Sequence, residues 1–118
     1  MAKMTHFPAA SERNFPSMEV AGCNAWLGDV AASNDPDKTI VSGFFRLERS
    51  EKPLVYDYTY DEMKCIFAGE FTITDETGQS VKGRPGDVFY FPAGSQITFE
   101  TDDFGLGFFC GQRREGEG

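Results

Sequence analysis

Five residues with hydroxyl, carboxyl or amine groups occupy alternate positions in the middle of the chain. They are Tyr56, Tyr58, Tyr60, Glu62 and Lys64. Successive side chains of a β-strand point to opposite faces, so residues two positions apart share a face. An extended segment would therefore gather all five groups on one face, unless a turn at Asp61-Glu62 interrupts the alternation before Lys64.

These residue types suit acid–base chemistry on a small oxygenated molecule. The phenols of Tyr56 and Tyr58 could hold or polarise a ligand oxygen, with Tyr90 as a third ligand-binding candidate on the opposite wall. Glu62 in an apolar pocket would have a raised pKa and could act as a general base. Lys64 would supply positive charge. Glu62, Tyr58 and Lys64 are thus the candidate catalytic residues for an isomerisation, elimination or dehydration.

A purely structural interpretation of the same residues stays open. Tyrosines in β-barrels often pack in the core or at the rim with a satisfied hydroxyl, and this applies to Tyr56, Tyr58 and Tyr90 alike. Glu62 and Lys64 could simply form a partly buried ion pair. The sequence does not separate this interpretation from a ligand site.

The chain has only one histidine, which argues against sites that depend on imidazole groups. His6 lies in Met1–Arg13, a polar, aperiodic segment expected to pack loosely. The rest of the chain has no imidazole, so a His-ligated metal centre and a Ser-His or Cys-His nucleophile pair are not expected. We therefore expect no metal and no cofactor.

Charge and cysteine usage narrow the class of protein further. Eleven Lys and Arg against nineteen Asp and Glu give a net charge of −8, which disfavours nucleic-acid binding. No apolar stretch reaches the roughly 20 residues that span a bilayer, and Met1–Ala10 has no apolar run typical of a signal peptide. The three cysteines, Cys23, Cys65 and Cys110, lie far apart, which favours free thiols and a cytoplasmic location.

The elements that must position the candidate residues are short β-strands. β-Branched and aromatic runs alternate with turn signals about every 8–12 residues, and no helical period is sustained between Asn24 and Gly111. Expected strands cover Thr39 to Glu48, Leu54 to Tyr60, Met63 to Ala68, Glu70 to Thr74, Val88 to Phe91, Gln96 to Thr101 and Phe104 to Cys110, with a shorter mixed segment at Ala25 to Val30. This pattern predicts an all-β sandwich or barrel.

The chain has the length of one domain, with boundaries set by composition. Residues 1–23 are predicted to form an N-terminal arm, residues 24–111 the β-barrel and residues 112–118 a flexible tail. The pairs Phe44-Phe45 and Phe108-Phe109 put one ring on each face of their strands. The outward rings need another surface to cover them, which predicts a homodimer.

Two segments carry a resemblance to a known family. The segment nearer the C-terminus joins a Gly-Asp turn, an apolar strand and a Pro-x-Gly turn, in the sequence Gly86-Asp87-Val88-Phe89-Tyr90-Phe91-Pro92-Ala93-Gly94-Ser95. The other segment is Tyr56-Asp57-Tyr58-Thr59-Tyr60-Asp61-Glu62, and Gly69 comes after six further residues. Together they resemble the two motifs of the cupin superfamily. Their amino-acid sequences are similar to those of the EutQ-like ethanolamine-utilisation branch and its small stand-alone relatives. The resemblance implies a single-domain RmlC-like jelly roll and a dimer.

The departures from the family pattern concern its metal ligands. Cupins commonly use two His and a Glu from the first motif and one His from the second. Tyr56 and Tyr58 stand at the first two positions, Glu62 keeps the Glu, and Ile97 replaces the last His. The resemblance therefore implies the barrel without its usual metal centre. If Tyr56 and Tyr58 point into the barrel as the family's His do, the polar set described above would line its interior.

The sequence leads to one favoured function and two alternatives. The favoured one is an EutQ-like cupin that binds a small polar molecule in its barrel, with metal-independent acid–base chemistry of the isomerase or lyase type. A non-catalytic small-molecule-binding or accessory protein is the first alternative. A metallo-cupin that uses Glu62 with other oxygen ligands is the second, less favoured because oxygen-only sites usually gather several carboxylates.

Overall fold

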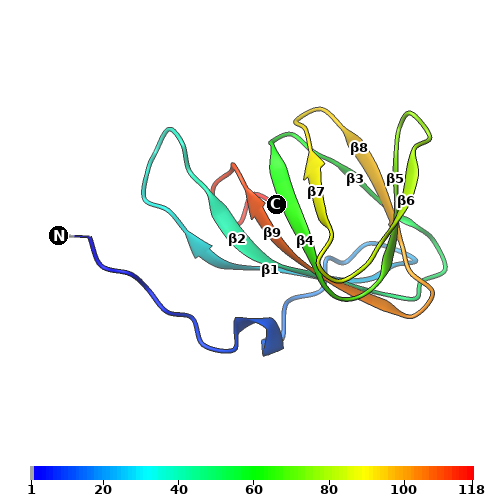
Figure 1. The fold of residues 1–118 in the computed structure, drawn as a ribbon, viewed down its shortest axis with the longest axis horizontal. Helices are drawn as coiled ribbons and strands as arrows, with labels where there is room; N and C mark the ends of the chain where they lie inside the picture. The colour runs from blue at the N-terminus through cyan, green and yellow to red at the C-terminus, as the bar shows by residue number, and fades with distance from the viewer. Residues whose placement is uncertain (1) are drawn as a thin grey trace.

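Two antiparallel β-sheets pack face to face in a computed structural model that describes residues 2–118 (Figure 1). The strands of the described chain are β1 (Asn24–Ala32), β2 (Val41–Glu48), β3 (Leu54–Asp57), β4 (Glu62–Gly69), β5 (Phe71–Asp75), β6 (Ser80–Gly83), β7 (Val88–Phe91), β8 (Gln96–Glu100) and β9 (Phe104–Gly111). A short 3₁₀ helix, η1 (Ala10–Glu12), precedes them. The all-β, single-domain prediction is confirmed.

The strand order shows how distant segments come together. The large sheet has the order β1-β2-β9-β4-β7, and the small sheet has the order β3-β8-β5-β6. Consecutive strands often lie in different sheets, so the chain crosses between layers, as it does from β3 to β4. Within residues 2–118, no helix is long and apolar enough to cross a bilayer.

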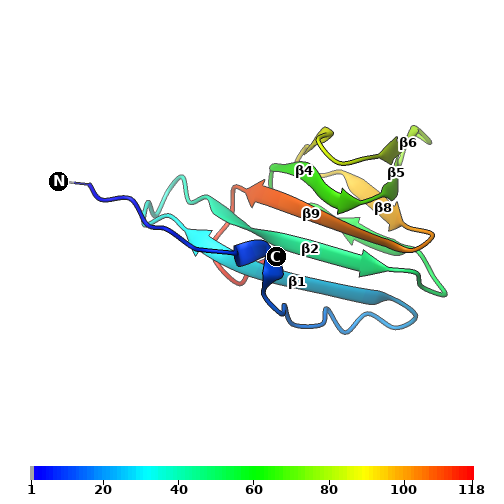
Figure 2. The ribbon, with the colours of Figure 1, turned by 60° about the horizontal axis from the view of Figure 1, so that its bottom comes forward.

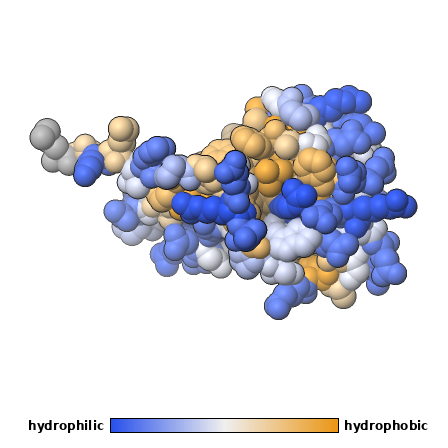
Figure 3. Space-filling view, turned by 90° about the horizontal axis from the view of Figure 1, so that it is seen from below, coloured by the Kyte–Doolittle hydropathy of each residue, from blue (hydrophilic) through white to orange (hydrophobic). Residues whose placement is uncertain are grey.

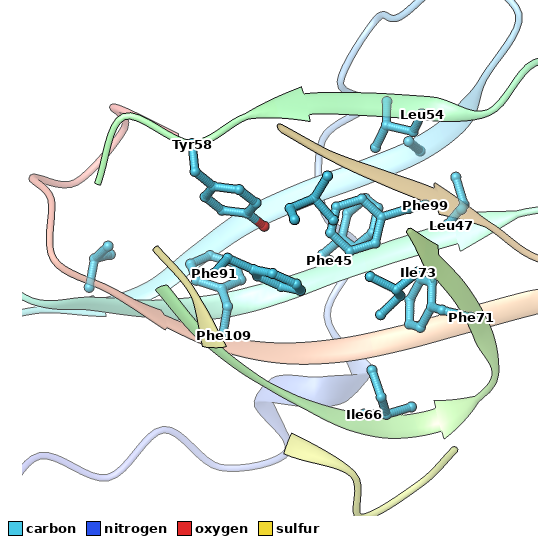
Figure 4. Close-up of a cluster of buried hydrophobic side chains, with 13 residues drawn as sticks. Phe45, Leu47, Leu54, Tyr58, Ile66, Phe71, Ile73, Phe91, Phe99 and Phe109 are labelled. Carbon is cyan, nitrogen blue, oxygen red and sulfur yellow. The ribbon is translucent and has the colours of Figure 1, made fainter. Parts of the chain in front are cut away.

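Aromatic rings fill the space between the sheets, as Figure 4 shows. Phe45 of β2 stacks on Phe71 and meets Phe99 edge-on, and Phe91 also contacts Phe99. Phe109 is 1% exposed. The phenylalanine pairs divide as strand alternation predicts: Phe45 and Phe109 join the core, and their neighbours point outward.

The N-terminal segment packs more closely than an arm ending at residue 23 would suggest. Ser17 bridges Trp26 of β1, and the Met18 amide donates to the Ala25 carbonyl at 2.9 Å. The Phe15 ring stacks on Phe44. In Figure 2 this segment runs beside β1, so its second half extends the large sheet.

The tail also differs from the flexible segment expected after residue 111. Arg113 is 7% exposed, and its guanidinium makes two hydrogen bonds to the Asp29 carboxylate of β1, at 2.7 and 3.1 Å. The Gly116 amide donates to the same carboxylate at 2.7 Å. The packed part of the chain therefore continues past Gly111.

Candidate functional site

A narrow pocket opens between β1 and β3, the edge strands of the two sheets. Its walls are the side chains of Met18, Leu27, Phe45, Leu54, Tyr56, Tyr58, Tyr60, Glu62, Lys64 and Phe99. The volume open to the centre of a water molecule is about 20 Å³, room for about one ordered water. All five polar residues of the alternating set thus meet at one pocket, as their spacing predicted.

The backbone reaches this arrangement through a loop and not through one long strand. β3 ends at Asp57, so Tyr58 and Tyr60 lie in the crossing between the sheets, and β4 begins at Glu62. The Tyr58 amide donates to the Ser95 carbonyl at 2.9 Å, and the Gly94 amide donates to the Tyr58 carbonyl at 2.7 Å. Gly94 has a φ of 92°, which favours glycine at this turn. The turn after β7 therefore fixes the position of Tyr58.

A buried triad of Tyr58, Glu62 and Lys64 forms the base of the pocket. These side chains are only 3–4% exposed. The Tyr58 hydroxyl donates to Glu62 Oε2 at 2.6 Å, and Lys64 Nζ lies 3.4 Å from the same oxygen. Figure 4 shows the Tyr58 hydroxyl pointing into the core. The three predicted catalytic residues are thus in direct contact.

Aromatic rings enclose the Lys64 ammonium. Nζ lies 4.5 Å from the centroid of the Phe45 ring and 4.7 Å from that of Phe99, within cation–π range. Burial lowers the pKa of Lys64, and the attraction of Glu62 opposes this shift only in part. The ammonium therefore has one carboxylate partner and otherwise faces π-systems.

The remaining tyrosines form a second polar layer. The Tyr56 and Tyr60 hydroxyls share a hydrogen bond of 3.0 Å. Burial, followed by the nearby charge of Glu62, raises the pKa of Tyr58 well above its ordinary value. Burial and the hydrogen bond to Tyr56 raise the pKa of Tyr60 in the same direction. Tyr58 and Tyr60 are therefore neutral hydrogen-bonding groups at physiological pH.

Arg113 is a supporting residue that the sequence interpretation missed. Its guanidinium carbon lies 5.5 Å from the centroid of the Tyr60 ring, and its charge is paired with Asp29. Burial alone would raise the pKa of Asp29, but bonds from Arg113 and the Gly116 amide hold it below its ordinary value. β9 ends at Gly111 and the chain bends at residues 112 and 113, so strand alternation gave no signal for the burial of Arg113.

Tyr90 does not lie at this pocket. Its neighbours Phe89 and Phe91 turn toward the interior, so Tyr90 points outward and is 53% exposed. Its hydroxyl donates to Asp61 Oδ1 at 3.0 Å, and the Ala93 amide donates to the same oxygen at 2.8 Å. Tyr90 therefore helps to fix the loop before β4, and the structure does not bring it together with the other ligand-binding candidates.

The positions where cupins commonly hold a metal do not fit one here. Tyr56 and Ile97 are register partners of β3 and β8, so the two motif segments do lie side by side. Ile97 offers no donor atom, and Glu62 already accepts a hydrogen bond from Tyr58 and forms an ion pair with Lys64. Among residues 2–118, no group of three or more His, Cys, Asp or Glu side chains could ligate an ion together. We derive no metal chemistry for this pocket.

Solved structures with the same architecture are cupins. The ethanolamine utilization protein Q of Salmonella typhimurium LT2 superimposes with a TM-score of 0.68 and 23% identity, over 83% of this chain and 77% of that one. KdgF from Halomonas sp. gives a TM-score of 0.69 at 18% identity, over 94% of this chain and 96% of that one. At these identities the comparisons show the fold, a cupin jelly roll.

Sequence comparisons identify the branch. Residues 34–106 match the model of the EutQ-like cupin domain. The chain is also 32% identical over 75 residues to a protein of Escherichia coli (strain K12) named acetate kinase EutQ, which covers 64% of this chain. The match spans only 30% of that relative's length. The chain therefore belongs to the EutQ-like cupin family.

Proposed function

We propose that this cupin domain binds a small, uncharged, oxygenated molecule in the pocket between β1 and β3 and transfers protons to and from it. The observation that carries the proposal is the buried Glu62–Lys64 pair, whose atoms lie 3.4 Å apart at the base of the pocket. A general base and a charged donor beside one apolar pocket are the elements of an isomerase or lyase of the acid–base type.

Charge balance supports an uncharged ligand. The ammonium of Lys64 is neutralised by the carboxylate of Glu62, and the pKa shift of Tyr58 keeps its phenol protonated. A ligand carrying a net charge would enter an apolar environment without a free counter-charge, which is costly. A hydroxyl or carbonyl compound meets no such cost.

Each side chain has a role that its position permits. The Tyr56 and Tyr60 hydroxyls would orient the ligand oxygen as hydrogen-bond partners. Glu62 would accept a proton from the ligand and return it at another position, so that the protein ends unchanged. The Lys64 ammonium would stabilise the negative charge that develops on the ligand oxygen.

The pocket must widen before a ligand of several atoms can enter. Its volume of about 20 Å³ is that of roughly one water. Met18, on the segment beside β1, is one of its walls and has a flexible, unbranched side chain. We therefore assign Met18 as the side chain that a ligand displaces, and Met18→Ala should tighten ligand binding.

A second candidate function is binding without chemistry, as an accessory protein. The observation in its favour is that the polar groups of the pocket are already paired with one another, Tyr58 with Glu62 and Tyr56 with Tyr60. The proton-exchange measurement below separates the two functions.

Proton exchange in D₂O tests the proposal directly. Hydroxyacetone, lactate and 1-amino-2-propanol are matched probes of neutral, negative and positive charge, and their binding is measured by NMR titration. We expect hydroxyacetone to bind best and to exchange carbon-bound protons for deuterium. Glu62→Gln should abolish the exchange, whereas Glu70→Gln, the same change at the exposed Glu70–Lys82 pair, should not.

Two results would contradict the proposal. Hydroxyacetone binding with no enhanced exchange supports the accessory function. Equal exchange in wild type and Glu62→Gln would refute the role of Glu62. Circular dichroism of each variant confirms that the protein compared is folded.

The kinase activity in the printed name of the E. coli relative is not part of the proposal. This chain covers less than a third of that protein, and a nucleoside triphosphate far exceeds the pocket. The proposal does include a cytoplasmic location, supported by the free state of Cys23, Cys65 and Cys110.

A further inference from the structure

Lys64 differs from the other lysines of the chain in its surroundings. All five lysines lie within residues 2–118, and four of them are exposed, namely Lys3, Lys38, Lys52 and Lys82. Hydrophilic residues cover much of the molecular face drawn in Figure 3. Lys64 instead lines the pocket between β1 and β3 and is 3% exposed. An ammonium group is strongly hydrated in water, so its burial here needs an explanation.

The Lys64 amine has fewer acceptors around it than it has N–H groups. An ammonium carries three N–H groups, and buried donors are normally hydrogen-bonded. Glu62 Oε2 lies 3.4 Å from Nζ, in the one ion pair that the described residues provide for it. The Tyr58 hydroxyl is directed at Glu62, and the rings of Phe45 and Phe99 lie 4.5 and 4.7 Å from Nζ. These surroundings suit a neutral amine, whose free electron pair can attack carbon.

We infer that Lys64 forms a covalent Schiff base with an aldehyde or ketone that enters the pocket. The inference rests on the proposed function, because it narrows the uncharged, oxygenated ligand to a carbonyl compound and adds a covalent step to the role of Lys64. Burial in an apolar pocket activates a lysine for this reaction by favouring the neutral, nucleophilic amine. In agreement, burial lowers the pKa of Lys64.

Proton transfer between Lys64 and Glu62 makes the reaction possible. Glu62 Oε2, 3.4 Å from Nζ, takes one proton from the ammonium, and the freed electron pair of Nζ attacks the carbonyl carbon. A proton moves from the nitrogen to the former carbonyl oxygen, which gives a carbinolamine. The Glu62 carboxyl then returns its proton to this hydroxyl, the C–O bond breaks, and water leaves as the C=N bond forms. One ammonium and one carbonyl group thus become one iminium and one water, without an oxidant or a reductant.

The charge of the pocket is the same before and after this reaction. Lys64 carries one positive charge as an ammonium and as an iminium, and Glu62 is a carboxylate in both states. The ion pair in the apolar core is therefore kept, and the reaction leaves no unpaired charge there. The iminium withdraws electrons from the adjacent carbon, so Glu62 can remove a proton from that carbon. The covalent step thus prepares the proton transfer of the proposed function.

Reductive trapping tests the inference. The whole chain is mixed at neutral pH with hydroxyacetone, or with the smaller glycolaldehyde, and with cyanoborohydride, which reduces an iminium to a stable secondary amine. We expect one rapid adduct by mass spectrometry, and peptide mapping should place it on Lys64. Labelling there should be at least about tenfold faster than at any other lysine, since an exposed lysine is protonated at neutral pH. Lys64→Met should remove the rapid phase, whereas Lys82→Met, the same change at the exposed Lys82–Glu70 pair, should not.

Exchange of the carbonyl oxygen is a second readout, which a purely electrostatic role of Lys64 would not change. Formation and hydrolysis of the iminium replace the carbonyl oxygen of hydroxyacetone by one from water. In isotopically labelled water, we therefore expect faster oxygen exchange with the wild type than with Lys64→Met or without protein. If circular dichroism shows that Lys64→Met does not fold, peptide mapping of the wild-type adduct still decides the question.

The outcomes separate this inference from the proposed function. Labelling spread evenly over the exposed lysines, or no adduct while hydroxyacetone binds, would overturn the Schiff base. Exchange of carbon-bound protons in D₂O without adduct or oxygen exchange would also overturn it, and the proposed function would then stand with Lys64 acting by charge alone. An adduct on Lys64 without proton exchange would support the Schiff base and contradict the proposed acid–base chemistry. Failure of both carbonyl probes to bind would contradict both.

Discussion

Breaking the Glu62–Lys64 pair from one side should be far more costly than removing both charges. Glu62→Gln leaves the Lys64 ammonium buried between Phe45 and Phe99 without a counter-charge. Lys64→Met instead leaves the Glu62 carboxylate with only the Tyr58 hydroxyl. The double variant has neither buried charge, and methionine fits an aromatic enclosure well.

The separation of the charges sets the magnitude. At 3.4 Å and an effective dielectric constant near 20, the attraction is about 5 kcal/mol. Losing one partner of a buried pair costs about 3–5 kcal/mol. In Glu62→Gln, Lys64 can lose its proton instead of staying buried as an unpaired charge. Neutralising a lysine of ordinary pKa at pH 7 costs about 4.6 kcal/mol, so the loss of unfolding free energy cannot exceed that value. In Lys64→Met, the corresponding limit on the loss of unfolding free energy is the cost of protonating a glutamate of ordinary pKa at pH 7, about 3.7 kcal/mol.

Urea denaturation, followed by the fluorescence of the single tryptophan Trp26, measures all four proteins of the cycle. We expect each single variant to lose several kcal/mol and the double variant to return close to wild type, a coupling of at least about 3 kcal/mol. Glu70→Gln, at an exposed pair, should cost less than about 1 kcal/mol. Additive single effects, with coupling below about 1 kcal/mol, would refute this account of the pocket.

Three further outcomes follow from the same contacts. The lowered pKa of Lys64 means that the unfolded chain binds more protons between the folded and unfolded pKa values, so wild-type stability should rise relative to Lys64→Met as pH increases toward about 10. Arg113→Met should cost about 3 kcal/mol in urea; the Asp29 contribution, present above about pH 4, should vanish as pH falls through its lowered pKa. The raised pKa of Tyr58 means that wild type loses stability above about pH 10, and urea midpoints between pH 9 and 11 should fall less for Tyr58→Phe.

The spacing of the candidate residues predicted the pocket for a reason that was only partly right. Tyr56, Glu62 and Lys64 lie on strands, and alternation places them correctly. Tyr58 and Tyr60 reach the same pocket from a loop, held by bonds from the turn at Gly94 and Ser95. Such long-range backbone bonds have no local signature in sequence.

Tyr90 and Arg113 show where local patterns stop. Val88-Phe89-Tyr90-Phe91 is apolar at every position, so either parity could have faced the core, and the packing of Phe91 on Tyr58 decides it. Arg113 lies in a charged, glycine-rich tail whose composition is typical of disorder. Its burial depends on Asp29, 84 positions away, which composition does not reveal.

The cost of the buried pair is itself an argument for a site. The chain makes specific room for Lys64: a Cβ on Gly107 of β9 would lie 3.1 Å from Lys64 Cδ, so glycine at that position clears the path of the lysine stem. Apolar residues of similar volume often replace a buried ion pair with no loss of stability, or with a gain. If Glu62→Gln combined with Lys64→Met proves as stable as wild type, stability alone does not account for the pair. That result would support the proposed transfer of protons to a ligand beside Tyr56 and Tyr60 as the function of these two charges.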